Sequence, residues 1–304
     1  MTTDYQEGKI EYTRELEGYL DALRRSGRKD NTIYTIRSNV RQCIKCLVAD
    51  GRPYKSEEIT TDDIAYLFRT LPVKEEVARN YLRTLAGMVI YYTGKDVVKQ
   101  ANLLFNREQH TRIFITREEF RTLYQHATPF QRLVIMLGGC MGLRRCEMHS
   151  IRDGDIRGNT MVIHGKGHGT KGMMTTVTIP EPVIAEIAAY RQWKEENHTG
   201  QILDDYLLQK ANGVTGVVKR CGISTISNEI HQLGEDCGII VTTHSFRRFF
   251  GTSLYYEAHT DLQTVKNLMR HANVATTLKC YVEASDIRER EAMGKLMSFM
   301  SPLF

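Results

Sequence analysis

One short interval of strand pattern within a largely helical sequence most constrains how this chain folds. Residues 160–164 and 173–179 favour two strands, joined by a glycine-rich turn and stopped by Pro180. Most of the remaining chain shows the apolar spacing and the end signals of helices. We therefore predict a mainly α-helical protein with a small β-sheet or hairpin, of the α+β class.

The helical patterns indicate two domains, for which 304 residues suffice. The first, over residues 1–96, consists of helices alone. The first predicted helix begins near Glu11 and ends by Gly27, and the second begins at a cap, Asn31-Thr32, and ends at Gly51. A short third helix begins at a cap, Thr60 or Thr61. The fourth runs from Glu75 to Tyr92 and is followed by Thr93-Gly94.

A stretch without clear periodicity, residues 97–112, is the predicted linker to the second domain. That domain, residues 113–284, opens with a capping box from Thr116 to Glu119, and the apolar segment 133–143 follows. Residues 285–304 form a predicted tail helix, capped by Ser285 and apolar on one side. Packing on its own domain and docking on a neighbouring protomer are both open for this tail.

Composition excludes several classes of protein. The seven cysteines are an odd number without a disulfide framework, and Cys43 and Cys46 lie on the apolar stripe of a helix, which favours buried thiols over a metal site. We expect no metal and no cofactor. No apolar run is long enough to span a bilayer, and the first residues lack a signal-peptide pattern, so we expect a cytoplasmic protein.

Two predicted helices of the first domain carry basic side chains at i, i+4 spacing. Arg37, Arg41 and Lys45 form one stripe, and Arg79 and Arg83 form the other. Such stripes suit contacts with DNA phosphates, and a net charge of +5 permits them. A solvated polar face explains the same pattern equally well.

Four short segments of the second domain hold cationic, imidazole and phenol groups. In GLRRCE, residues 142–147, glycine turns place Arg144 at the start of a helix, where its guanidinium suits a phosphate. In GKG, residues 165–167, Lys166 is placed to give a proton to a leaving oxygen, although a lysine in a hairpin turn is ordinarily just exposed.

The third segment is THSFR, residues 243–247, where Thr243 is a predicted helix cap and the i, i+3 spacing places His244 and Arg247 on one face. The fourth, residues 268–281, contains His271 and Tyr281. Taken singly, these residues are ordinary surface or core side chains. Their combination is not explained in that way.

The motifs GLRRCE, GKG, HSFR and HANVATTLKCY occur in the order and approximate spacing of the tyrosine recombinase and integrase family, which includes Xer, Cre and lambda integrase. The family patterns read roughly GLRxxE, GKG, HxLRH and LGHxxxxTTxxxY. The second domain therefore resembles the catalytic domain of DNA-breaking-rejoining enzymes, and the first resembles a SAM-like core-binding domain. Four motifs in order are far more specific than any one of them.

The resemblance implies a role for each matching residue. The catalytic pocket would consist of Arg144, Lys166, His244, Arg247 and His271, with Tyr281 as the nucleophile. Cleavage would proceed through a 3′-phosphotyrosyl link without metal or ATP. Arg145 and Arg248, next to the two catalytic arginines, are further predicted DNA contacts.

Several positions depart from the common pattern. Arg270 stands where the family usually has glycine, Phe246 replaces a leucine and Arg248 replaces the second histidine of HxLRH. Tyr281 lies ten residues after His271, where many Xer-like members have nine. These departures leave the predicted pocket intact and put partner and site preference in doubt.

The implied partners are double-stranded DNA with a specific recombination site and further copies of the chain. The family acts as a homotetramer on two DNA sites, through a Holliday junction. Whether the free protein is a monomer is left open. Two alternatives remain. One is DNA relaxation of the type IB topoisomerase kind, and the other is a non-catalytic DNA-binding protein of the same fold.

Overall fold

The structure is a computed structural model that describes residues 2–104, 113–165, 174–197, 202, 204–211, 214–271, 273 and 297. The chain divides into two compact units, with the described residues up to 104 in the first and those from 113 onward in the second. Each unit has its own hydrophobic core.

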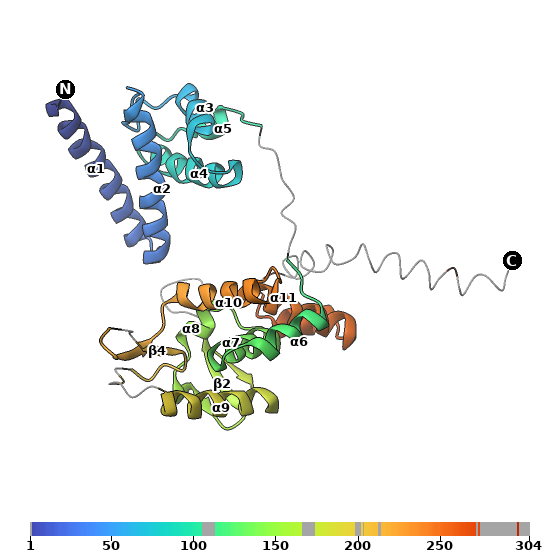
Figure 1. Cartoon of the computed structure of the whole chain (residues 1–304). Coiled ribbons are helices and arrows are strands. Elements are labelled where there is room, and N and C mark those ends of the chain that lie inside the picture. Colours follow the sequence, from blue (N-terminus) through green and yellow to red (C-terminus); the bar gives the residue numbers. More distant parts are fainter. Residues whose placement is uncertain are drawn as a thin grey trace. The chain divides into compact units, whose positions relative to one another are not determined.

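The first unit is helical throughout (Figure 1). The long helices α2 and α4 pack against each other, and α1 and α3 each pack against both of them. Their apolar faces meet in a core that includes Leu20, Val40, Leu47 and Leu82. The helices are α1 (Thr2–Arg25), α2 (Asp30–Ala49), α3 (Thr61–Thr70), α4 (Glu75–Thr93) and α5 (Val97–Gln100).

Local end signals explain most of these boundaries. Thr60, one of the two predicted caps, caps α3, and it forms a capping box because its hydroxyl accepts from the Asp63 amide while the Asp63 carboxylate accepts from the Thr60 amide. Gly94 ends α4 with φ of 70°, a left-handed conformation that favours glycine. Both predictions are confirmed.

Three boundaries in this unit differ from the prediction. Helix α1 begins at Thr2 rather than near Glu11, because its first turns lack the apolar periodicity by which a helix is detected in sequence. Helix α2 begins at Asp30, after Lys29, so Asn31 and Thr32 lie inside the helix and do not cap it. The predicted linker began at Val97, which instead starts α5 and is buried in the core of this unit.

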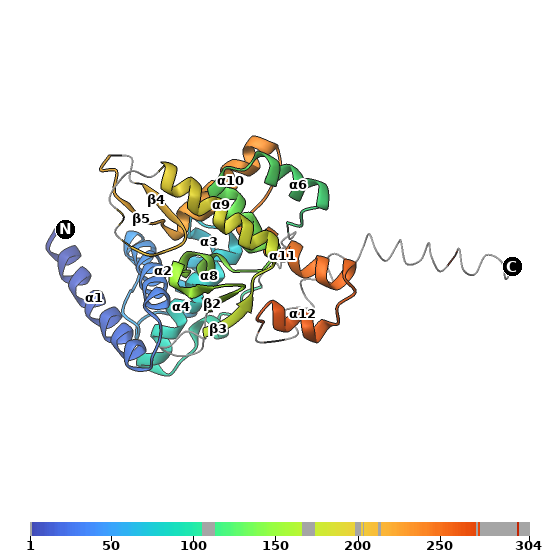
Figure 2. The same cartoon turned by 90° about the horizontal axis from the view of Figure 1, so that it is seen from below.

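The second unit combines helices with two small sheets (Figures 1 and 2). Helix α7 packs between α9 and α11, and α10 covers α6 and α8. Helix α12 lies at the opposite end of the unit from β4 and β5 (Figure 2). The helices are α6 (Arg117–His126), α7 (Pro129–Gly139), α8 (Arg145–Ser150), the 3-10 turn η1 (Asp153–Asp155), α9 (Glu181–Asn197), α10 (Ile223–Cys237), α11 (Thr243–Thr252), the π-helical turn η2 (Ser253–Glu257) and α12 (Leu262–Leu268).

The main sheet has three antiparallel strands in the order β1 (Ile156–Arg157), β2 (Thr160–His164) and β3 (Met174–Thr178). Met161 and Ile163 of β2 are buried in the core of the unit, so one face of the hairpin is covered. The two predicted strands are confirmed within the described residues. Strand β1 and a second sheet, formed by β4 (Gln209–Ala211) and β5 (Val218–Arg220), were not predicted, because such short strands carry little periodicity.

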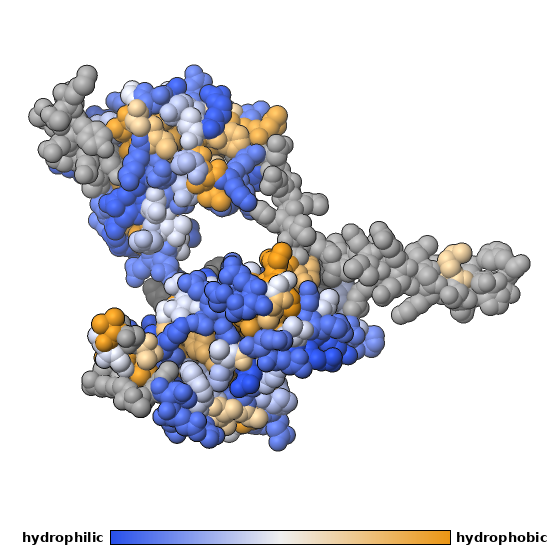
Figure 3. All heavy atoms as spheres, in the orientation of Figure 1, coloured by the Kyte–Doolittle hydropathy of each residue, from blue (hydrophilic) through white to orange (hydrophobic). Residues whose placement is uncertain are grey.

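The fold is mainly helical with small sheets, as the α+β prediction states. Hydrophilic residues cover most of the face of each unit seen in Figure 3, with small apolar patches between them. Among the helices that the structure describes, none combines the length and the apolar character needed to cross a membrane.

Candidate active site

The turn between α7 and α8 places Arg144. Gly142 has φ of 59° at this turn, and a Cβ atom there would overlap the Phe250 ring, so only glycine fits without displacement. The chain then enters α8 with Arg144 as the residue before the first helical position. Arg144 thus stands at the start of a helix, as predicted.

Arg247 lies on α11, and its side chain is 1% exposed. A buried guanidinium needs hydrogen-bond acceptors, and Arg247 donates to the backbone carbonyl oxygens of Gly142 and Met269. The cap of α11 differs by one residue from the prediction. Thr242, rather than Thr243, precedes the helix, and its hydroxyl accepts from the Ser245 amide.

Glu147 joins the two arginines. Its side chain is 0% exposed, and its Oε1 atom accepts from Nη1 of Arg144 at 2.6 Å. The Oε2 atom accepts from the Arg144 amide at 2.8 Å, and Nη1 of Arg247 lies 3.9 Å from it. Glu147 therefore occupies the Arg144 amide, which leaves the Arg144 guanidinium as the group of this residue that can bind a phosphate.

Burial alone would raise the pKa of Glu147, but the neighbouring cations Arg270 and Arg144 outweigh burial and hold that pKa below its ordinary value. The carboxylate is therefore ionised at neutral pH. Three guanidinium groups surround it, of Arg144, Arg247 and Arg270, so this cluster carries more positive than negative charge. A cluster of this kind favours an anionic ligand.

His271 follows Arg270 directly and belongs to the same electrostatic cluster. Burial lowers the pKa of His271 to about 4, with further lowering from Arg247, Arg144, His244 and Arg270. The imidazole is therefore neutral at neutral pH in the DNA-free protein. His244 is exposed near the start of α11 and is among the groups that lower the pKa of His271.

The structure thus brings together four of the six predicted catalytic residues: Arg144, His244, Arg247 and His271. Lys166 and Tyr281 lie outside the described residues. The predicted tail helix from Ser285 also lies outside them, apart from Met297.

Glu147 was not among the predicted site residues, and Arg270 was predicted only as a departure from the family pattern. The spacing of Glu147, three residues after Arg144 at a helix start, is a capping signal that pointed to it. Nothing in the local sequence pointed to Arg270, because its ion pair joins residues 123 positions apart.

The predicted DNA-contact residues are arranged in several ways. Arg41, Lys45 and Arg83 are exposed, and Arg79 is half-buried. Arg37 donates to Oε2 of Glu17 at 2.6 Å. In the second unit, the exposed Arg145 donates to the Ser227 hydroxyl, and the half-buried Arg248 donates to the Ile113 carbonyl oxygen at 3.2 Å.

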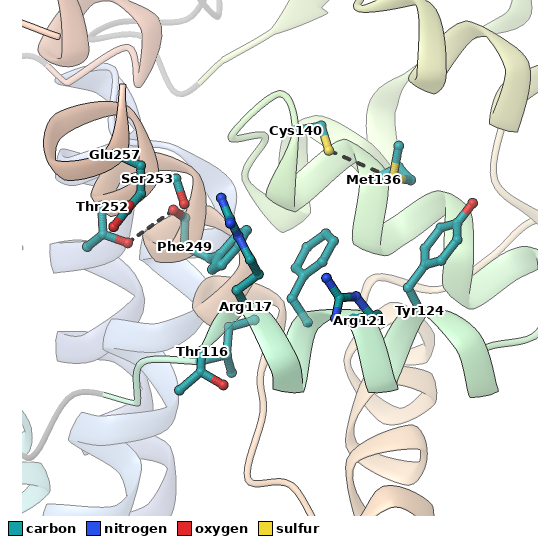
Figure 4. Close-up of a pocket in the computed structure, with 12 residues that line it drawn as sticks. Thr116, Arg117, Arg121, Tyr124, Met136, Cys140, Phe249, Thr252, Ser253 and Glu257 are labelled. Carbon is teal, nitrogen blue, oxygen red and sulfur yellow. Dashed lines mark hydrogen bonds between the residues drawn. The ribbon is translucent and has the colours of Figure 1, made fainter. Parts of the chain in front are cut away.

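A separate pocket of about 930 Å³ lies between α6 and the end of α11 (Figure 4). Arg117 and Arg121 of α6 line it together with Phe249 of α11. Cys140 also lines it, but burial raises the pKa of that thiol, which makes it a poor nucleophile. The pocket lacks the convergence of cations found around Glu147, so we place the candidate site at the arginine cluster.

Metal binding has no support in the part of the chain that the structure describes. There, no three His, Cys, Asp or Glu side chains are placed to hold an ion. The chemistry available to the described cluster is hydrogen bonding and charge, directed at an anion such as a phosphate.

Residues 113–288 match the phage integrase family, and this chain belongs to that family. The tyrosine recombinase XerC of Caldanaerobacter subterraneus subsp. tengcongensis is 25% identical over 191 residues, which are 60% of this chain and 50% of that protein. The match thus spans half the length of that curated relative.

Solved structures share the fold. A lambda integrase dimer bound to a COC′ core site is 15% identical, with a TM-score of 0.66 over 88% of this chain and 76% of that one. The Tn1549 transposon integrase in complex with a circular intermediate DNA is 18% identical, with a TM-score of 0.66 over 93% of this chain and 99% of that one. Both therefore resemble this chain in fold.

Proposed function

We propose that this protein is a site-specific DNA recombinase that cleaves and rejoins strands of double-stranded DNA through a covalent bond to Tyr281. The observation that carries the proposal is the pair of arginines, Arg144 and Arg247, from separate motifs, held around one buried carboxylate with positive charge in excess. Family membership supports the same activity. Two structural neighbours were solved as complexes, the lambda integrase with a COC′ core site and the Tn1549 integrase with a circular intermediate DNA.

The proposed reaction is a transesterification at phosphorus. The Tyr281 oxygen attacks the phosphate, the bond to the 5′ oxygen breaks, and a 3′-phosphotyrosyl bond forms. Charge builds up on the non-bridging oxygens in the transition state. Arg144 and Arg247 would stabilise it with charge-assisted hydrogen bonds, which are strongest in a partly dehydrated site.

The remaining predicted residues would handle protons. His244 would accept the Tyr281 proton, and Lys166 would protonate the leaving 5′ oxygen. His271, neutral at neutral pH in the free protein, would donate one hydrogen bond to the phosphate. Attack by a 5′-hydroxyl from a second strand then reverses the step and reseals the backbone, so the bond energy is retained.

The proposed assembly consists of four copies of the chain on two duplex sites, and strand exchange proceeds through a Holliday junction. A lambda integrase tetramer bound to a Holliday junction is among the structures of similar fold, with a TM-score of 0.62. In this arrangement, the first unit would hold the duplex through phosphate contacts.

The test is covalent capture of DNA. A library of nicked duplexes with a randomised core is incubated with the protein, and adducts that survive denaturation are recovered and sequenced. We expect the wild-type protein and Tyr34→Phe, a change at a tyrosine that is 72% exposed, to form adducts. We expect none from Tyr281→Phe, which lacks the attacking oxygen.

The outcomes separate the alternatives. An unchanged adduct in Tyr281→Phe would overturn the assignment of the nucleophile. An adduct accompanied by relaxation of supercoiled plasmid, without recombinant products from two selected sites, would favour the topoisomerase. Selective DNA binding without any adduct would favour a non-catalytic DNA-binding protein.

A further inference from the structure

Arg270 adopts a backbone conformation that usually belongs to glycine. It follows the last turn of α12 with φ of 54°, in the left-handed region. Side chains with a Cβ atom are disfavoured there, which is why glycine is common at this position after helices. An arginine at such a position needs a compensating interaction, and its side chain makes several.

The Arg270 guanidinium reaches back to the turn before α8. Its Nη2 atom donates to the Gly142 carbonyl oxygen at 2.7 Å and to Oε2 of Glu147 at 3.1 Å. Its Nη1 atom donates to the Leu268 carbonyl oxygen at 2.8 Å. With 14% of the side chain exposed, this ion pair is well shielded from water. Arg270 thus fastens the end of α12 to the Arg144 turn.

The segment fastened in this way holds both catalytic arginines. The carbonyl oxygen of Arg270 itself accepts from Nη2 of Arg144 at 2.9 Å. The carbonyl oxygen of the preceding residue, Met269, accepts from Nη2 of Arg247. Movement of this segment would therefore displace both guanidinium groups, together with His271, which follows in the chain.

Arg270 is also the cationic donor to Oε2 of Glu147, which accepts a second hydrogen bond from the Arg144 amide. Nη1 of Arg247 stands 3.9 Å from that oxygen, beyond hydrogen-bond distance, and donates to Gly142 instead. Without the Arg270 guanidinium, the buried carboxylate would have one cation fewer, and Arg247 is near enough to replace it. That exchange would draw Arg247 away from a bound phosphate.

We propose that Arg270 is a positioning residue for strand cleavage: its bonds to Glu147 and Gly142 fix the Met269–His271 segment and hold Arg144 and Arg247 in place for the phosphate. This inference rests on the proposed function and deepens it. Arg270 acts through the two arginines rather than on the DNA.

Three variants test the role. Arg270→Gly fits the left-handed backbone and removes the guanidinium, Arg270→Met keeps much of the volume without the charge, and Arg270→Lys keeps the charge without the planar fork. Lys266→Met, which removes a nearby cation in the last turn of α12, is the matched control. Thermal unfolding of each variant establishes that it is folded.

The rate of adduct formation is measured in a single turnover at saturating DNA, on a site recovered by covalent capture. Misplacement of reacting groups by about 1 Å can lower a rate by roughly 100-fold. We expect Arg270→Gly and Arg270→Met to lose roughly 10- to 100-fold in rate, with smaller losses for Arg270→Lys and none for Lys266→Met. DNA affinity, measured in a Tyr281→Phe background, should change less than about 3-fold, because Arg270 does not contact DNA.

A DNA-free readout is the titration of the His271 imidazole by NMR. Arg270 is one of the cations that lower the pKa of His271, together with Arg247, Arg144 and His244, so the pKa should rise in Arg270→Gly and Arg270→Met. Adduct rates within about 3-fold of wild type in both folded variants would overturn the inference. A wild-type protein that forms no adduct at all would instead overturn the proposed function, and this inference with it.

Discussion

Two cations of the first unit and one arginine of the second differ most in their surroundings. On α2 of the first unit, Arg41 and Lys45 are exposed. In the second unit, the Arg247 side chain is 1% exposed and donates to backbone carbonyl oxygens at two separate points of the chain. The exposed side chains are accessible to a ligand at the surface, whereas hydrogen bonds fix the Arg247 guanidinium before any ligand arrives.

This difference in exposure and hydrogen bonding indicates which role suits each set of cations. Exposed cations on a duplex release counterions, so they contribute affinity that falls steeply with salt. Fixed cations in a shielded site lower the energy of a charged transition state, because they need no reorganisation during the reaction. The comparison predicts that changes in the second unit act mainly on rate and changes in the first mainly on affinity.

The largest effect should follow Arg247→Gln. Loss of one preorganised donor typically lowers a rate by roughly 10²- to 10³-fold, and here the Glu147 carboxylate also loses a neighbouring cation. We expect single-turnover adduct formation to fall by at least that factor, while DNA affinity in a Tyr281→Phe background falls far less. The control is His231→Gln on α10, whose side chain is 71% exposed. A rate for Arg247→Gln within 10-fold of wild type would contradict the proposal that the fixed cations of the second unit act mainly on rate.

A smaller effect should appear in the pH dependence of stability. The pKa of His271 is lowered from its ordinary 6.5 to about 4, chiefly by burial, so between these pH values the folded protein binds fewer protons than the unfolded chain. Stability contributed by the neutral imidazole is therefore complete above pH 6.5 and is lost as the pH falls toward 4.

The measurement is urea unfolding of wild type and His271→Gln at several pH values from 4 to 7. We expect the free energy of unfolding to fall more steeply with decreasing pH in the wild type, because glutamine does not titrate. Parallel curves for the two proteins would show that His271 is not held in the buried, cation-rich environment described above.

The same contrast between local and distant interactions decides how much could be predicted from sequence. The caps at Thr60 and Thr116, the end of α4 at Gly94 and the entry of Arg144 into α8 all depend on residues within a few positions. Sequence patterns report such short-range relations directly, so these features were predicted correctly.

Features that depend on distant partners were missed. The α11 cap is a local exception: it was predicted at Thr243 because adjacent threonines satisfy the same pattern, and it lies at Thr242, which pairs with Ser245. The grouping of Arg144, Arg247 and His271 came from resemblance to a family, not from spacing. The role of Arg270 came from neither, because the family pattern has glycine there and the partner Glu147 belongs to another motif.

The smallest effect should come from the exposed stripe on α2. Arg41→Gln and Lys45→Gln should each weaken binding to a short duplex by a few-fold and lower the slope of log affinity against log salt by about 1, as expected for one phosphate contact. Arg37→Gln is the informative comparison on the same helix, because Glu17 already pairs with Arg37 at 2.6 Å and competes with DNA for it. Its effect should be smaller, and adduct rates at saturating DNA should stay unchanged in all three. If the slope is the same in Arg41→Gln and Lys45→Gln as in wild type, the stripe is a solvated face and the first unit holds DNA by other residues.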